Sequence, residues 1–164
     1  ESDAALVDRL SEPFKTVGRD SETPHAVTAT WIISFEQLER RHTPTSNVLS
    51  VISLFDRQGI PKEFITDYWH RTHATESGAS EAADITKVLG TLKAFSFISE
   101  GNDHSVDMHR LVQLVTRKWL INKKRVAKFV QDVLQIVSDA YPFGRFETRE
   151  LCLKYLPHAQ AVLK

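Results

Sequence analysis

Apolar side chains recur along most of the chain at the three- and four-residue spacing of a helix that buries one face. The pattern predicts helices over residues 4–17, 26–41, 44–58, 61–71, 81–94, 111–121, 126–137 and 151–163. In the fourth of these, Phe64, Ile65, Tyr68 and Trp69 share one face of the expected helix. The sequence therefore predicts a mainly α fold.

Proline and glycine mark where several of these helices begin and end. Thr43 followed by Pro44 predicts a helix start, because a threonine hydroxyl can accept from free N–H groups and proline lacks the N–H that would need a partner there. Gly59 is placed to end that helix, and Pro61 is placed to begin the next one.

Polar stretches separate other helices. Residues 17–25 have turn composition and predict a surface loop. Residues 72–80 predict a polar linker whose last residue, Ser80, caps the following helix. Near the C-terminus, residues 141–144 interrupt the helical pattern, and Pro157 is expected to kink the last helix.

A stretch of strand character lies between two of the expected helices. Residues 96–99 are short and β-prone, a turn with Gly-Asn follows at 100–103, and residues 105–108 alternate polar and apolar. This order predicts a β-hairpin. Three helices, a hairpin and a further helix over residues 44–121 are the element order of a winged-helix domain, a helical bundle with a small β-hairpin wing.

Composition narrows the class of protein. The chain has 164 residues, of which 41% are hydrophobic and 26% charged, as is usual for a soluble globular chain. No apolar run approaches the ~20 residues that a membrane-spanning helix needs, and the first residues do not resemble a signal peptide. A single cysteine, Cys152, excludes an internal disulfide. These features favour a reducing compartment, and we expect a cytoplasmic protein without a membrane partner.

The formal net charge of zero hides a division between the two parts of the chain. Residues 1–107 carry 10 basic and 17 acidic side chains, a net −7, and residues 108–164 carry 11 basic and 4 acidic, a net +7. Residues 108–131 hold seven Lys or Arg and no Asp or Glu. Such a run is usually a solvated face. Alternatively, it meets an anion or an acidic surface, such as the acidic part of the same chain.

The charge of the expected recognition helix bears on DNA binding. In winged-helix proteins that bind DNA, the helix corresponding to residues 81–94 enters the major groove. Here Lys87 and Lys93 are balanced by Glu81 and Asp84. Because phosphate contacts supply much of the affinity for DNA, a neutral helix argues against a nucleic-acid partner.

Residues with catalytic or metal-binding chemistry are few. The chain has no glycine-rich phosphate loop. His70 and His73 have the spacing of half a zinc site, but no second ligand pair appears. Cys152 lies six residues before His158, a poor spacing for a nucleophile and its base on one helical face. The sequence therefore predicts no catalytic residue and no metal site within this chain.

His109 is the strongest candidate for a binding role. It stands where the second hairpin strand gives way to a helix. A helix N-terminus offers free N–H groups and positive potential to a phosphate, and Arg110 adds a charge beside it. The alternative is a structural histidine, because polar side chains are common at helix starts.

Several blocks of sequence resemble one family. They lie at residues 29–38, 56–61, 92–98, 108–113, 119–120 and 156–163. In this order they resemble NB-ARC proteins, which are STAND signalling ATPases related to plant resistance proteins and to animal apoptosome and inflammasome sensors. The first, second and last blocks are similar to the fungal branch with tetratricopeptide repeats (TPR), which is often labelled kinesin-light-chain-like.

The resemblance implies a nucleotide role for His109. Met108-His109 matches the first two residues of the family's Met-His-Asp motif, whose histidine touches the β-phosphate of bound ADP in the resting state. Arg110 stands where that motif has Asp, and Met-His-Arg-Leu-Val-Gln is the form of the fungal branch. The resemblance implies ADP or ATP as the cofactor of the intact protein. Stable binding to this chain alone is not expected, because the phosphate loop would lie upstream of Glu1.

The resemblance also implies a layout and partners. Residues 1–42 correspond to the end of a helical subdomain and a linker helix, residues 44–121 to the winged helix, and residues 122–164 to the start of the repeats. This chain is then no enzyme by itself, although its parent is a P-loop NTPase. The implied partners are the upstream nucleotide-binding domain, the downstream TPR array and further copies of the parent, which oligomerises on activation.

Two rival functions stay open at this stage. A DNA-binding winged-helix regulator would use Lys87, Lys93 and the basic residues of 117–128. A structural adaptor would join repeats to another domain without any nucleotide role. The sequence gives no indication of the upstream effector domain or of the ligand that the repeats sense.

Overall fold

The computed structural model describes the backbone of residues 22–73, 78–142 and 146–163, and the side chains within these ranges except for 22–29 and 78–81. Its elements are α2 (Glu22–Arg41), α3 (Thr43–Leu54), β1 (Ile60–Pro61), α4 (Lys62–Thr72), α5 (Gly78–Ala94), β2 (Ile98–Glu100), β3 (Ser105–Met108), α6 (Arg110–Asn122), α7 (Val126–Ala140), the 3-10 helix η1 (Phe146–Thr148) and α8 (Arg149–Val162). The prediction of a mainly α fold is confirmed. The helix expected over residues 4–17 lies outside the described residues.

A small antiparallel sheet interrupts the helices. Its strand order is β1–β3–β2, with Ile98 opposite Met108 and Ile60 opposite Val106. The predicted hairpin of β2 and β3 is therefore confirmed. The two-residue strand β1 was not predicted, because a pair of residues before a helix carries no alternating pattern that sequence analysis can detect.

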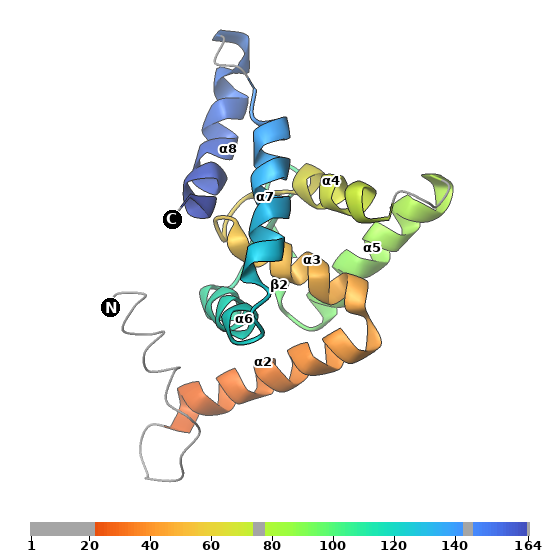
Figure 1. Ribbon diagram of the computed structural model, residues 1–164, viewed down its shortest axis with the longest axis vertical. Coiled ribbons are helices and arrows are strands. Elements are labelled where there is room, and N and C mark those ends of the chain that lie inside the picture. Colours follow the sequence, from red (N-terminus) through yellow and green to blue (C-terminus); the bar gives the residue numbers. More distant parts are fainter. Residues whose placement is uncertain (1–21, 74–77, 143–145, 164) are drawn as a thin grey trace.

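Helix α3 lies at the centre of the core. It contacts α2, α4, α5, α6 and α7, which surround it in Figure 1. The largest fully buried side chains include four phenylalanines, Phe55, Phe64, Phe97 and Phe129. The buried cluster extends from Phe35 on α2 to Tyr155 on α8, so one core joins residues of all three expected segments. The segment boundaries themselves stay a prediction.

Helix α3 begins at the residue that the sequence predicts, but the Thr43 hydroxyl does not cap it. The helix begins at Thr43, and Pro44 lies in its first turn. The residue before it, His42, is the N-cap and makes no side-chain hydrogen bond to the first turn. The Thr43 hydroxyl instead donates to the Glu39 carbonyl of the preceding helix at 3.1 Å. The expected threonine cap is therefore wrong.

Gly59 does not end α3, which stops at Leu54 with Phe55 in an extended conformation. Gly59 lies further on, at a φ of +64°. Its N–H donates to Asp107 Oδ1 of β3 at 2.6 Å, so this glycine directs the chain into β1. Left-handed backbone of this kind favours glycine because it has no Cβ.

Two other helix starts differ from the predictions, whereas the kink expected at Pro157 stays a prediction. Helix α2 begins at Glu22, so the last part of the expected 17–25 loop is helical, and Pro24 is tolerated in a first turn. Helix α5 begins at Gly78, which places Ser80 inside the helix and not at its cap. Helix α8 runs through Pro157 to Val162. No helix within the described residues is both long and apolar enough to cross a membrane.

Candidate phosphate-binding site at the start of helix α6

His109 is the N-cap of α6 and directly follows β3. Its backbone is extended, with φ −65° and ψ 135°, and its ring Nδ1 accepts a hydrogen bond from the Leu111 N–H at 3.2 Å. Because Nδ1 accepts, the proton of the neutral ring lies on Nε2. The residue thus caps its own helix and keeps one ring donor for another partner.

The exposed His109 ring lies next to helix α2. Its centroid is 5.7 Å from that of Trp31, and the two rings are tilted by 53°. Trp31 is itself half-buried. An aromatic neighbour on one side and the hydrogen bond from Leu111 on the other restrict the ring orientation.

The start of α6 is held firmly in place. The buried Met108 donates its N–H to the Arg57 carbonyl at 2.7 Å. About two turns into α6, Arg117 Nε donates to the Ser53 carbonyl at 2.6 Å, and its terminal nitrogen lies 3.2 Å from the Phe55 carbonyl oxygen. A guanidinium at the C-terminal end of α3 also complements the helix dipole. The chain before His109 and the helix after it are therefore both anchored to α3 and its following loop.

A polar cavity of about 220 Å³ opens beside Arg110, between α6, the loop after α3 and the end of α8. Its wall includes three guanidinium groups, those of Arg57, Arg110 and Arg117, together with the Asp56 carboxylate. Asp56 accepts from the Gln58 N–H at 3.0 Å. His109 does not line this cavity. The structure therefore places Arg110 within a basic cavity and His109 next to it in sequence, facing Trp31.

Sequence reasoning missed Arg57. Among the described residues its guanidinium has no hydrogen-bond or ion-pair partner, so its charge is available in the cavity. The Met108 N–H pairs with the Arg57 carbonyl, and this pairing brings Arg57 next to the start of α6, where it lines the same cavity as Arg110. No local spacing in the sequence signals that pairing.

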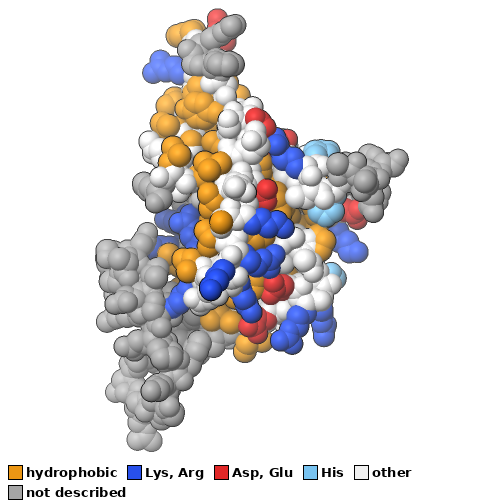
Figure 2. Space-filling view, in the orientation of Figure 1, with side chains coloured by type: hydrophobic (Ala, Val, Ile, Leu, Met, Phe, Trp, Pro, Cys, Tyr) orange, Lys and Arg blue, Asp and Glu red, His pale blue; other side chains and the backbone are white. Residues whose placement is uncertain are grey.

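Basic side chains of residues 108–164 pair with acidic side chains of residues 1–107. Arg125 forms an ion pair with Glu39 at 2.7 Å and lies over the Trp119 and Phe129 rings. On α8, Lys154 pairs with Glu63 at 2.8 Å. Figure 2 shows Lys and Arg side chains over the first part of α7, interspersed with acidic ones. These pairs support the interpretation that the basic part meets the acidic part of the same chain.

The other candidate residues lie apart from one another. His73 stacks on Trp69 with ring centroids 4.0 Å apart. Within the described ranges, no group of three or more His, Cys, Asp or Glu side chains is placed to hold a metal ion.

Cys152 and His158 have separate surroundings. The half-buried Cys152 Sγ lies 3.8 Å from the Pro142 carbonyl oxygen. The His158 ring is 1% exposed, and its Nε2 lies 3.1 Å from the Gly59 carbonyl oxygen. The structure therefore does not bring the thiol and the imidazole together as a nucleophile and its base.

Fold and site together define a mainly helical domain with a three-stranded sheet and a basic cavity beside a histidine-capped helix. Residues 34–125 match the family described as "Domain of unknown function (DUF7779)", and the chain belongs to this family. It is also 36% identical, over 163 residues, to a "Nucleotide-binding leucine-rich repeat (NLR)-like protein" of Hyaloscypha variabilis. That match covers 99% of this chain and 15% of the relative. The similarity supports an NLR-like family relationship. No solved structure matches the chain.

Proposed function

We propose that this chain is the regulatory winged-helix segment of an NLR-like signalling ATPase of the NB-ARC class. In this proposal it couples the ADP or ATP state of the parent protein to conformational change and oligomerisation. The observation that carries the proposal is the position of His109, which directly follows β3, caps α6 and retains an Nε2–H donor. That is the position the Met-His motif requires.

The topology supports the winged-helix part of the proposal. Helix α3 is followed by β1, α4, α5, the β2–β3 hairpin and α6. The first strand pairs with the last one, so that β3 is central in the sheet. A first strand that joins the hairpin in this way supports the proposal that the hairpin is a wing attached to the helical bundle.

The charges near His109 support a phosphate ligand. A helix N-terminus carries positive potential, and the Nε2–H of His109 can donate to a phosphate oxygen there. Arg110 extends from the next residue into the cavity that Arg57 and Arg117 also line. A diphosphate bound by the upstream domain would meet positive charge on this side.

In this proposal, another part of the parent protein supplies the phosphate loop that this chain lacks. The chain spans about 15% of the length of its NLR-like relative, whose name describes it as nucleotide-binding. We therefore place the phosphate loop in a domain outside this chain, and this chain contacts the nucleotide from one side without hydrolysing it. We keep the cytoplasm as the proposed compartment.

Exposed apolar side chains on α8 and at its C-cap, Leu163, support a helical neighbour. Leu153, Leu156 and Leu163 are 59%, 40% and 78% exposed. In Figure 2, apolar side chains continue along α8 and the adjoining part of α7. Such a face suits packing against a following helix, as the proposed TPR array would supply.

The proposed mechanism is a population shift between two states. With ADP bound, its phosphate links the ATPase domain to His109 and holds the winged helix in place. Exchange for ATP removes that link, and the winged helix rotates as a rigid body and permits oligomerisation.

The test uses the longer protein that carries the upstream domain. His109→Asn keeps a good N-cap but loses the imidazole donor, whereas His109→Ala loses both. Each should release ADP about tenfold faster, because a charge-assisted hydrogen bond is lost. His104→Asn is the control, since His104 is exposed with a φ of 57°, which asparagine tolerates.

Two measurements test the phosphate contact of His109, namely ADP retention and the resting oligomeric state. If both are unchanged in His109→Asn, the phosphate role is wrong. If the longer protein binds no nucleotide at all, the structural-adaptor function replaces this proposal.

The described contacts do not favour DNA binding. Lys93, on the expected recognition helix α5, pairs with Glu100 of the hairpin. Arg117 and Arg125 make internal contacts with α3 and with Glu39. Absence of duplex DNA binding at low salt would remove that function.

A further inference from the structure

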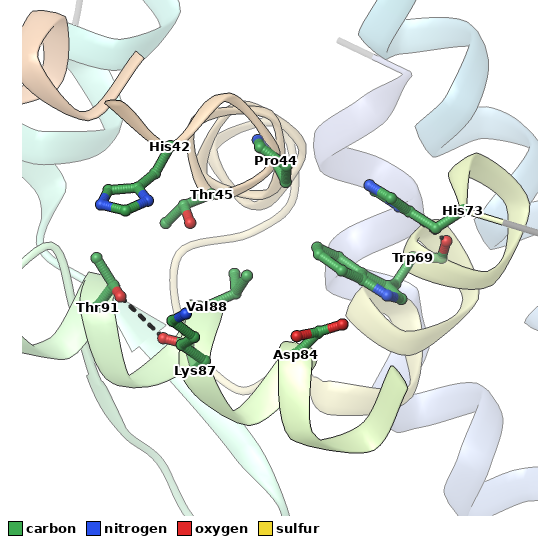
Figure 3. Close-up of a pocket in the computed structure, with 9 residues that line it drawn as sticks. All are labelled: His42, Pro44, Thr45, Trp69, His73, Asp84, Lys87, Val88 and Thr91. Carbon is green, nitrogen blue, oxygen red and sulfur yellow. Dashed lines mark hydrogen bonds between the residues drawn. The ribbon is translucent and has the colours of Figure 1, made fainter. Parts of the chain in front are cut away.

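A second cavity lies where the start of α3, the end of α4 and the middle of α5 meet. Its volume is about 320 Å³. Figure 3 shows His42 and Thr45 along one side, Lys87 below them, and Trp69 with His73 on the other side. None of its lining residues lines the basic cavity beside Arg110. We call it the α3 pocket.

The N-terminus of α3 is uncapped at this pocket. The N-cap residue His42 makes no side-chain hydrogen bond to the first turn, and the first turn holds no acidic residue. The Thr43 hydroxyl is engaged with the Glu39 carbonyl. The first N–H groups of a helix have no partner within the helix. Their positive potential is therefore not offset by a side chain of α3.

Thr45 is the unusual residue of the pocket. It is only 5% exposed, and among the described residues no group hydrogen-bonds to its hydroxyl. The hydroxyls of Ser46, Ser50 and Ser53 on the same helix all donate to backbone carbonyls. Figure 3 shows the Thr45 hydroxyl pointing into the space between His42 and Lys87. With no partner among the described residues, this hydroxyl can donate to a ligand atom in the pocket.

Lys87 brings positive charge to the same place. Its side chain is exposed, and within the described ranges its ammonium group has no ion-pair partner. The Thr91 hydroxyl donates to the Lys87 carbonyl at 2.9 Å and does not occupy the ammonium group. Asp84 is the acidic side chain among the described lining residues, and it lies on the Trp69 side in Figure 3. The positive and negative groups thus lie at different sides of the pocket.

We propose that the α3 pocket binds a small phosphomonoester. The phosphoryl oxygens accept from the hydroxyl and the backbone N–H of Thr45, and they pair with the Lys87 ammonium group. A phosphate fills only part of about 320 Å³, since one water occupies about 30 Å³. The rest of the pocket, with Pro44, Val88 and Trp69 in its wall, receives the organic part of the ligand.

The experiment titrates two probes, inorganic phosphate and phenyl phosphate, into this chain at constant ionic strength. Backbone amide signals of Thr45 and Lys87 report binding by NMR. We expect saturable shifts with both probes and tighter binding of phenyl phosphate, whose ring contacts the apolar wall. Thr45→Val and Lys87→Gln should each weaken binding about tenfold, because each removes a hydrogen bond to a charged ligand.

Matched controls carry the same chemical changes outside the pocket. Thr86→Val removes a hydroxyl that is already bonded to the Ala82 carbonyl, and Lys128→Gln removes an exposed charge on α7. Neither should change the affinity. Lys87→Gln alters an exposed side chain, so it keeps the test valid if Thr45→Val fails to fold.

Three outcomes would overturn the proposal. One is the absence of saturable shifts with either probe. The second is an equal response to chloride at the same ionic strength. The third is unchanged affinity in Lys87→Gln. Equal affinity for the two probes would support the phosphoryl site and assign free phosphate as its ligand. The proposal does not depend on His109, so its outcome is independent of the nucleotide role.

Discussion

The Gln113 side chain on α6 donates its amide to the Phe55 carbonyl at 2.8 Å, and the same nitrogen lies 3.1 Å from the Ser53 carbonyl oxygen. Both carbonyls belong to the end of α3, where a helix leaves acceptors unpaired. Gln113 is 8% exposed, so water cannot readily replace it. A residue four positions after His109 thereby fixes the distance between α6 and α3.

We first predict that Gln113→Leu destabilises the chain by about 0.5–1.5 kcal/mol, because it removes the buried amide hydrogen bonds to the Ser53 and Phe55 carbonyls, to which Arg117 still donates. Gln131→Leu makes the same change at an exposed position on α7 and should cost no more than about 0.5 kcal/mol. Urea unfolding followed by circular dichroism measures both values. Equal midpoints for the two variants would show that the cap contributes nothing.

Local pattern was sufficient to predict most of the helices. The face formed by Phe64, Ile65, Tyr68 and Trp69 is the buried face of α4. The hairpin was predictable because its alternation and its turn are both short-range signals. The errors at Gly59, as a helix end, and at Thr43, as a helix cap, have different causes. Gly59 is engaged with Asp107, a distant residue that the local sequence does not reveal. The Thr43 hydroxyl donates to the Glu39 carbonyl four residues earlier and so is not available to cap α3.

The candidate site was predictable only in part. The position of His109 at a helix start followed from the change of period at residue 108. The cavity did not, because Arg57 and Arg110 meet through the pairing of Met108 with the loop after α3. The basic run 108–131 was visible in the sequence. Whether its members face solvent or bind within the chain, as Arg125 binds Glu39, depends on tertiary packing.

A second prediction contrasts two glycines. Gly59→Ala should destabilise the chain by about 1–2 kcal/mol, because φ is +64° there and an L side chain is strained in that region. Gly90→Ala, at an exposed position inside α5, should stabilise it by about 0.5–1 kcal/mol. No atom lies within 4 Å of the added Cβ at either position, so backbone conformation alone separates them. Thermal unfolding of both variants checks the opposite signs.

The last prediction concerns pH and the buried His158. Burial lowers the pKa of its imidazole from the ordinary value of 6.5, while the hydrogen bond with the Gly59 carbonyl and the charge of Asp56 partly oppose that shift. Its Nδ1 has no partner among the described residues, so a second ring proton would be unpaired.

The sign of the effect follows from the direction of the shift. Between the lowered folded pKa and 6.5, the unfolded chain binds a proton that the folded chain does not. The contribution of His158 to the free energy of unfolding is therefore fully present well above pH 6.5. It is lost as the pH falls below 6.5, by at most about 1.4 kcal/mol per pH unit.

His158→Gln tests this directly, because glutamine keeps a donor for the Gly59 carbonyl but does not titrate. Urea unfolding at pH 7.5 and pH 5.5 should show a smaller loss of stability for the variant than for the unmodified chain. His104→Gln, at an exposed histidine on the hairpin turn, should leave the loss unchanged. If His158→Gln loses as much stability on acidification as the unmodified chain, groups other than this imidazole cause the acid sensitivity, and the role assigned to its burial is wrong.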